Sequence, residues 1–410
     1  MICKRTWIGI GFWMMVFTAS AQTGLKQAAW FGQLKREDGK VIRFHFDIKI
    51  EKNKTVMYLV NDAEHLRVDN IRYTKDSVFI EMPVFESYFK AKRISASRWE
   101  GSWTKGGSVK WQVMPFIAET QSSVPPQKLR SAVADISGKW AVTFTKADKV
   151  DRPGIGEWQQ KGNTLHGTIL TPTGDYRYLT GIVNGDSMQL STFDGAHAFL
   201  LTAKIKNGQQ ITGGVFYSGA TSSEPWEAIK NENVKLPNVA AMYMKDDKER
   251  LNFRFMDLDK KVVSITDVKF KNKVVIIQIM GSWCPNCMDE TAFLSDFYKR
   301  NKQRGLEIIG LAYEYTTDFD RSVKSIRKFR DRFKVEYTML NTGVTVSDSL
   351  RTEKTLPQMT QIKSFPTTIF LDKNGKVAKV KAGFEGPGTG AHYEEMKKEF
   401  ETTIDKLLKQ

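Results

Sequence analysis

The chain contains only three cysteines among its 410 residues. Cys3 lies in an N-terminal segment that resembles a cleaved export signal, and the other two form the motif Cys284-Pro285-Asn286-Cys287. A disulfide across so short a loop constrains little of the unfolded chain, and a protein of this length can bury a sufficient core without one. The absence of further cysteines therefore favours redox chemistry over a structural role for this pair.

Long apolar runs are also missing after the N-terminus. Residues 1–21 have the pattern of a secretory signal, with Lys4 and Arg5 before the apolar stretch Ile8–Phe17 and the small residues Ala19-Ser20-Ala21 at the cleavage position. An uncleaved membrane anchor is the alternative, but the stretch is short compared with the ~20 residues of a membrane span. The sequence thus predicts an exported protein of the periplasm or cell envelope.

The sequence also lacks the ligand spacing of a metal site. Its five histidines are scattered along the chain, and there is no second cysteine pair to complete a four-ligand zinc site. The expectation is therefore no metal and no bound cofactor.

Basic residues exceed acidic ones, with a formal net charge of +16. Such charge can indicate nucleic acid or an anionic surface. Export argues against nucleic acid, and the lysines are mixed with acidic residues along the whole chain. Peripheral contact with the lipid or glycan of the envelope is the remaining interpretation, in a compartment where disulfides persist.

The N-terminal half alternates apolar and polar residues. In residues 41–50, Ile42, Phe44, Phe46, Ile48 and Ile50 share one face of a predicted strand. Shorter strands are expected at residues 55–60, 77–82 and 109–114, and residues 120–130 are a predicted linker. Turn signals then recur every 10 to 12 residues up to about residue 230. We predict two antiparallel sandwich-like or barrel-like modules, at residues 22–125 and 131–232.

A weak internal similarity links the two modules. Ala91 precedes Gly101 by ten residues, and Ala203 precedes Gly213 by the same spacing. A tandem duplication and a chance similarity between strand-rich segments both account for it.

Residues 245–410 change to an α/β pattern. Buried strands are expected at residues 273–280 and 306–312, a helix from Cys284 to about Arg300, and a hairpin around Asn374-Gly375. The predicted inner face of that helix comprises Ala292, Phe293, Phe297 and Tyr298. Further helices are expected at residues 322–332 and 392–408.

The strand–Cys-x-x-Cys–helix order places Cys284 at a helix N-terminus, where unpaired N–H groups and the helix dipole favour a thiolate. We expect Cys284 to be exposed and to attack a disulfide, and Cys287, one turn further on, to resolve the mixed disulfide.

Three motifs then carry a family resemblance: Gly281–Cys287, the segment Phe365-Pro366-Thr367-Thr368, and Asp372–Gly375. With their order and spacing, the C-terminal two fifths of the chain resembles the thioredoxin superfamily and, within it, the TlpA/ResA-like exported thiol–disulfide oxidoreductases. The two N-terminal modules resemble no family that can be named.

The resemblance implies that Pro366 is cis, that it lies against the cysteine pair, and that the backbone of Phe365 pairs with substrate. It implies a packing and docking role for Trp283. Thioredoxin itself has a buried aspartate where this chain has Gln278, and related reductases place a glutamate near position 314. Glu314 is thus a candidate proton acceptor for Cys287, with a solvated surface glutamate as the alternative.

The predicted function is reduction of protein disulfides, or of a haem-attachment Cys-x-x-Cys as in cytochrome c biogenesis, with a membrane thiol transporter of the DsbD kind as electron donor. One alternative is a peroxiredoxin-like thiol peroxidase, although Gly281 stands where such enzymes place a threonine. Another is an envelope binding protein with an accessory redox domain.

Overall fold

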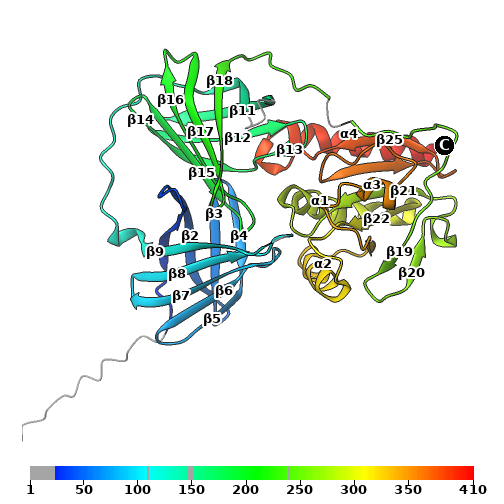
Figure 1. Cartoon of the computed structure of the whole chain (residues 1–410), viewed down its shortest axis with the longest axis horizontal. Coiled ribbons are helices and arrows are strands. Elements are labelled where there is room, and N and C mark those ends of the chain that lie inside the picture. Colours follow the sequence, from blue (N-terminus) through cyan, green and yellow to red (C-terminus); the bar gives the residue numbers. More distant parts are fainter. Residues whose placement is uncertain (1–23, 109, 146–150, 239–240) are drawn as a thin grey trace, which may run out of the picture.

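A computed structural model describes residues 24–108, 110–145, 151–238 and 241–410. The predicted signal at residues 1–21 lies outside the described residues. Three sheets follow one another along the chain, and the first two form a β-rich half beside a C-terminal α/β domain (Figure 1). The predicted multidomain fold class is confirmed.

The first sheet is an antiparallel meander in which the first strand pairs with both the second and the last. Within residues 24–108 and 110–123, β4 and β5 stand at its two edges. The elements are β1 (Ala28–Lys35), β2 (Val41–Glu51), β3 (Lys54–Asn61), β4 (Glu64–Val68), β5 (Asn70–Tyr73), β6 (Ser77–Glu81), β7 (Ser87–Ser95), β8 (Arg98–Lys105), β9 (Gln112–Thr120) and the 3-10 turn η1 (Gln121–Ser123).

Alternation along the strands builds the core of this sheet. On β2, Ile42, Phe44, Phe46 and Ile48 are buried as predicted, whereas Ile50 is exposed at the end of the strand. The strand predicted at residues 109–114 was placed too early. β9 begins at Gln112 and runs to Thr120, because its alternate residues from 114 to 120 continue the buried face.

The second sheet closes on itself, since β11 pairs with both β10 and β12. The first strand again pairs with the second and the last. The strands are β10 (Gly138–Thr145), β11 (Asp151–Lys161), β12 (Thr164–Thr171), β13 (Gly174–Asp175), β14 (Leu179–Asn184), β15 (Ser187–Phe193), β16 (Ala198–Lys206), β17 (Gln210–Ser218) and β18 (Ser222–Lys230).

The internal similarity falls on equivalent strands of the two sheets. Ala91 and Gly101 lie on β7 and β8, and Ala203 and Gly213 lie on β16 and β17, in both cases the two strands before the last one. On each first strand a buried tryptophan also donates from Nε1 to the carbonyl four residues earlier, Trp30 at 3.2 Å and Trp140 at 2.9 Å. Shared topology supports the duplication interpretation.

The third sheet has the order β20-β19-β23-β22-β21-β24-β25, with β21, β22 and β23 parallel and β24 antiparallel to β21. Its strands are β19 (Arg254–Asp257), β20 (Val262–Ser264), β21 (Val274–Met280), β22 (Leu306–Ala312), β23 (Thr338–Asn341), β24 (Thr367–Leu371) and β25 (Val377–Ala382). The helices are α1 (Pro285–Asn301), α2 (Phe319–Phe333), α3 (Arg351–Thr355) and α4 (Ala391–Lys409), with 3-10 turns η2 (Val268–Phe270), η3 (Lys302–Arg304) and η4 (Pro387–Thr389).

Both faces of the third sheet are covered, which explains the uninterrupted apolar sequence of β21. Ile276 faces the cluster that contains α1, α2 and α4, whereas Ile277 faces a second cluster around Phe253 and Leu356. On α1, Phe293, Phe297 and Tyr298 are buried as expected, but Ala292 is exposed and its assignment to the inner face was wrong. Leu294, which the prediction omitted, is fully buried instead.

Candidate redox site

The cysteine pair lies where β21 leads into α1. Cys284 is the N-cap of α1, Pro285 occupies the first turn, and Cys284 and Cys287 form a disulfide. The backbone N–H of Cys287 donates to Sγ of Cys284 at 3.2 Å. In the reduced protein this N–H and the helix dipole favour the thiolate of Cys284 over its thiol, because both present positive charge to the sulfur.

The loop before β24 lies against the same sulfur. The Phe365–Pro366 bond is cis, as the resemblance implies. Sγ of Cys284 lies 3.5 Å from the carbonyl oxygen of Phe365. The two motifs, about 80 residues apart in sequence, are thus brought together at one point.

Aromatic side chains hold Trp283 beside the cysteines. Its Nε1 donates to the carbonyl of Tyr313 at 2.8 Å, and its ring lies 5.5 Å from Tyr315 and 5.4 Å from Phe365 between centroids. These contacts fix the indole next to Cys284 and agree with a packing role.

Glu314 is buried just beyond β22. Its carboxylate accepts hydrogen bonds from the backbone N–H of Ser282 at 2.9 Å and from Oγ of Ser282 at 2.6 Å. Burial raises the pKa of Glu314 to about 7, although the Ser282 hydrogen bonds oppose this. The alternative of a solvated surface glutamate is therefore wrong, and the group can exchange a proton near neutral pH.

A second buried carboxyl was missed by the sequence analysis. Glu290 on α1 accepts a hydrogen bond from Nε2 of Gln278 at 2.8 Å and another from Oγ1 of Thr368. Burial raises the pKa of Glu290 to about 7, against the effect of these two hydrogen bonds. Gln278 itself cannot titrate, but it is hydrogen-bonded to a carboxyl group that α1 supplies. The signal was available, because residues three apart on a helix share a face and Glu290 follows Cys287 by three.

The expected exposure of Cys284 is wrong. Only 3% of the residue is accessible to solvent. Val84 and Phe85 of the first sheet and Ala196 of the second belong to the same buried cluster as both cysteines. The prediction considered the C-terminal domain alone, whereas the β-rich half packs over its active face.

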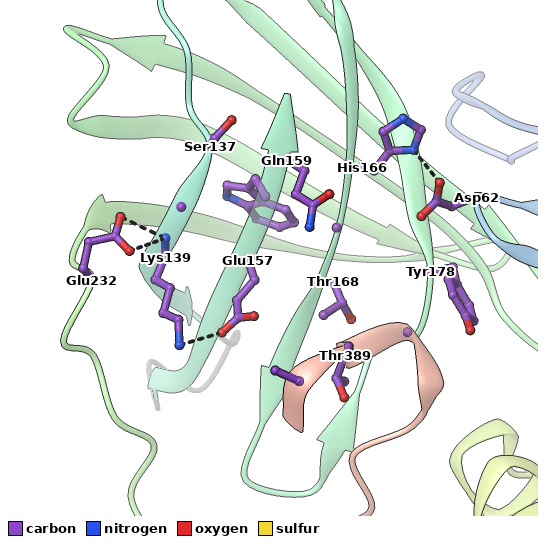
Figure 2. Close-up of a pocket in the computed structure, with 16 residues that line it drawn as sticks. Asp62, Ser137, Lys139, Glu157, Gln159, His166, Thr168, Tyr178, Glu232 and Thr389 are labelled. Carbon is purple, nitrogen blue, oxygen red and sulfur yellow. Dashed lines mark hydrogen bonds and ion pairs between the residues drawn. The ribbon is translucent and has the colours of Figure 1, made fainter. Parts of the chain in front are cut away.

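A polar cavity of about 500 Å³ lies apart from the cysteines, between the second sheet and the start of α4. Figure 2 shows Lys139 and Glu157 facing each other across its wall, with Thr168 and Thr389 close together and His166 beside Asp62. Lys139 and Glu157 are 3.2 Å apart, and His166 and Asp62 are 3.0 Å apart. Four of the charged groups on its wall are thus already paired with each other.

Neither a metal site nor a membrane span emerges from the residues described. No group of three or more histidine, cysteine or acidic side chains is arranged to hold a metal ion there. Likewise, none of the helices in the described ranges is both long and apolar enough to cross a bilayer.

Comparison with known proteins identifies the C-terminal part. Residues 233–397 match the family model described as Redoxin. This part of the chain is a Redoxin domain. The match begins after the second sheet, so the β-rich half lies outside it.

Curated relatives of the Redoxin domain include thiol–disulfide oxidoreductases named ResA. The protein from Bacillus thuringiensis subsp. konkukian is 28% identical over 135 residues, which cover 33% of this chain and 68% of that protein. ResA of Bacillus subtilis strain 168 is 25% identical over 132 residues, covering 32% and 64%. The Redoxin domain is therefore a thiol–disulfide oxidoreductase domain.

Solved structures are similar at lower identity. A putative thiol:disulfide interchange protein DsbE from Chlorobium tepidum has 19% identity and a TM-score of 0.30, covering 40% of this chain and 99% of that one. A DsbF homologue from Corynebacterium diphtheriae has 21% identity and a TM-score of 0.31, covering 42% and 98%.

Proposed function

We propose that the protein is an exported reductase of protein disulfides that works through Cys284 and Cys287. The thiolate of Cys284 attacks one sulfur of a substrate disulfide, which forms a mixed disulfide and releases the other substrate sulfur as a thiolate. Cys287 then attacks Cys284, so that the enzyme disulfide forms and the second substrate sulfur leaves reduced. Two electrons pass from the dithiol to the substrate in each cycle.

One observation carries this proposal. Sγ of Cys284 is capped by a helix N–H at 3.2 Å and lies 3.5 Å from a backbone carbonyl of the cis-proline loop. The first contact supports an ionised attacker. The second supports a role for Phe365 and Pro366 in holding an extended substrate segment beside it, in the manner of strand addition.

The resolving step needs a base, because Cys287 must lose a proton to become nucleophilic. Glu314 and Glu290 are both buried carboxyls with a pKa of about 7, which suits proton exchange near neutral pH. Glu290 shares a helix face with Cys287, whereas Glu314 is bound to Ser282 ahead of Cys284. We propose that one of these two carboxylates accepts the proton of Cys287.

The proposed partners follow from the same chemistry. Substrates are disulfide-containing proteins, among which a haem-attachment Cys-x-x-Cys is a candidate, and electrons come from a membrane thiol transporter of the DsbD kind. The compartment is the periplasm or cell envelope, on the strength of the signal pattern in residues 1–21.

The peroxidase alternative is disfavoured at position 281. A Cβ on Gly281 would lie 2.1 Å from Nε1 of Trp283, so a threonine that polarises peroxide has no room there.

Insulin reduction with dithiothreitol as electron donor tests the proposal. The native protein should accelerate it, and Cys284→Ser should return the rate to that of dithiothreitol alone. Equal rates for the two proteins, or a higher rate of peroxide consumption than of insulin reduction, would reject it. A glutathione titration of the Cys284–Cys287 pair sets the direction, since a potential near the thioredoxin value of about −270 mV fits a reductase.

A further inference from the structure

The turn between β12 and β13 lies directly across the redox site. The carbonyl of Thr173 accepts a hydrogen bond from Oγ of Ser364 at 3.0 Å, next to the cis-proline loop. Nδ2 of Asn286, between the two cysteines, donates to the carbonyl and to Oδ2 of Asp175, at 3.2 and 3.3 Å. One short turn of the second sheet thus contacts both segments that flank Cys284.

The backbones come close at the same place. A Cβ on Gly383, which follows β25, would lie 3.0 Å from the backbone of Thr173. The N–H of Gly386 donates to Oδ2 of Asp175 at 2.8 Å. The turn therefore fills the space beside the carbonyl of Phe365, where an extended substrate segment would have to bind.

Arg177, two residues beyond the turn, fastens it to α1. Its guanidinium forms a two-pronged ion pair with Asp289, with Nε to Oδ2 at 2.8 Å and Nη2 to Oδ1 at 2.9 Å. The same group reaches Glu64 of the first sheet at 2.5 Å and Asp194 of the second at 3.1 Å. One buried cation thus joins both sheets to the helix that begins at Cys284.

These contacts are of a kind that can be broken and remade. The turn is held by hydrogen bonds and ion pairs, and on separation these groups exchange their partners for water together. Removing one partner alone is different, because it leaves a buried charge uncompensated.

We infer that the β-rich half is a movable cover of the redox site, held by the Arg177–Asp289 pair, which must part from Cys284 before a protein disulfide can reach it. This rests on the proposed role of Cys284 as the attacking sulfur. A mixed disulfide adds a substrate sulfur and its carbon chain to an atom that has almost no access to solvent. The cover therefore selects for substrates that can displace the 173–175 turn.

A covalent adduct tests the cover directly. The reduced Cys287→Ser variant is treated with the aromatic disulfide 5,5′-dithiobis(2-nitrobenzoate). The thiolate of Cys284 forms a mixed disulfide with one half of the reagent and releases the other half as a thiolate. Amide hydrogen exchange is then measured over residues 171–178. The same variant without adduct is the control. Faster exchange in this segment of the adduct is expected. An adduct that leaves the exchange unchanged would overturn the cover, whereas failure to form any adduct would reject the role of Cys284 instead.

Loosening the pair gives a second test. Asp289→Asn removes one charge from the contact and should raise the rate of iodoacetamide alkylation of reduced Cys284 by about tenfold, as expected for the loss of a charge-assisted hydrogen bond. The matched control is Arg304→Gln, which breaks an exposed ion pair with Asp405 (2.6 Å) within the C-terminal α/β domain. Equal alkylation rates in the native protein and both variants would contradict the proposal.

Discussion

The two sheets of the β-rich half contact the Redoxin domain in chemically different ways. The second sheet contributes Arg177, whose side chain is 3% exposed and is surrounded by three carboxylates. It also contributes the hydrogen bonds of the 173–175 turn and a partly exposed pair between Glu157 and His392 at 2.8 Å. The first sheet adds two partly exposed pairs with α2: Arg321 with Glu86 at 2.8 Å, and Lys328 with Glu81 at 2.9 Å.

The buried contacts and the partly exposed contacts therefore contribute differently to docking. A buried cation among carboxylates is costly to leave without one of its partners, so the cluster favours the docked arrangement in which all of them are in place. Exposed ion pairs are weak and exchange readily with water. The Arg177 cluster therefore favours one docked arrangement of the β-rich half, and the two pairs with α2 add a smaller electrostatic contribution near Glu314.

The largest effect is expected from replacing Arg177. Arg177→Met removes the cation that Glu64, Asp194 and Asp289 share and should lower the free energy of unfolding by about 3–5 kcal/mol, because these buried carboxylates lose that partner. Urea denaturation followed by tryptophan fluorescence measures this. The comparison variant is Arg321→Met, and an equal loss of stability in the two would remove the distinction between the sheets.

The stability of the folded protein should depend on pH because of Asp175, which lies in the same contact between the second sheet and the Redoxin domain. Burial, with Asp289 nearby, raises the pKa of Asp175 to about 7. A carboxyl whose pKa is higher in the folded state stabilises that state most below its unfolded pKa of about 4, and this contribution is lost as pH rises to about 7. We expect the native protein to lose a few kcal/mol of stability over this range.

Asp175→Asn isolates the contribution of that group. This substitution should reduce the loss of stability between pH 4 and 7. The reduction should be partial, because Glu290 and Glu314 also have a pKa of about 7 and titrate in the same direction. An unchanged pH profile of thermal unfolding would show that Asp175 is ionised in the folded protein.

The two buried glutamates should respond differently to the first sheet. Glu86 raises the pKa of Glu314, after the larger effect of burial, whereas Glu290 lies among Redoxin-domain groups. Glu290→Gln and Glu314→Gln should each slow insulin reduction by about 100-fold if the carboxyl transfers a proton, the lower end of the usual range for general acid–base catalysis. Glu86→Gln should shift the pH–rate profile of Glu290→Gln to lower pH and leave that of Glu314→Gln in place. If the pH–rate profile shifts in neither variant, the ionisation of Glu314 does not control the rate.

The smallest effect is expected at the partly exposed pairs with α2. Glu86→Gln should change the free energy of unfolding by less than about 1 kcal/mol, and the change should shrink further as salt is added. Chemical denaturation in low and high salt measures it. A cost of several kcal/mol, insensitive to salt, would mean that the first sheet also docks through a specific contact.

The sequence predicted those parts of the site that belong to a local pattern. The cysteine pair, the cis-proline loop and the hairpin around Asn374-Gly375 each follow from a short motif. Glu314 was a candidate because the related reductases place a glutamate near this position, just after a strand. These features are independent of what packs against the Redoxin domain.

Features created by long-range contacts were not predicted. The burial of Cys284 depends on Val84 and Phe85, some 200 residues earlier, and no periodicity in either segment indicates that they meet. Nothing in the local sequence distinguishes Arg177, because its role depends on Asp289, which only the fold brings beside it. Glu290 was missed because a charged residue on a helix usually faces solvent.

Mixed-disulfide trapping tests most directly the claim that Cys284 is the attacking sulfur and Cys287 the resolving one. Reduced Cys287→Ser and Cys284→Ser are each incubated with oxidised glutathione and analysed by intact mass. The account predicts that a glutathione adduct accumulates rapidly on Cys284 in the first variant and forms far more slowly in the second. Equal rates of adduct formation, or faster modification of Cys287, would contradict it.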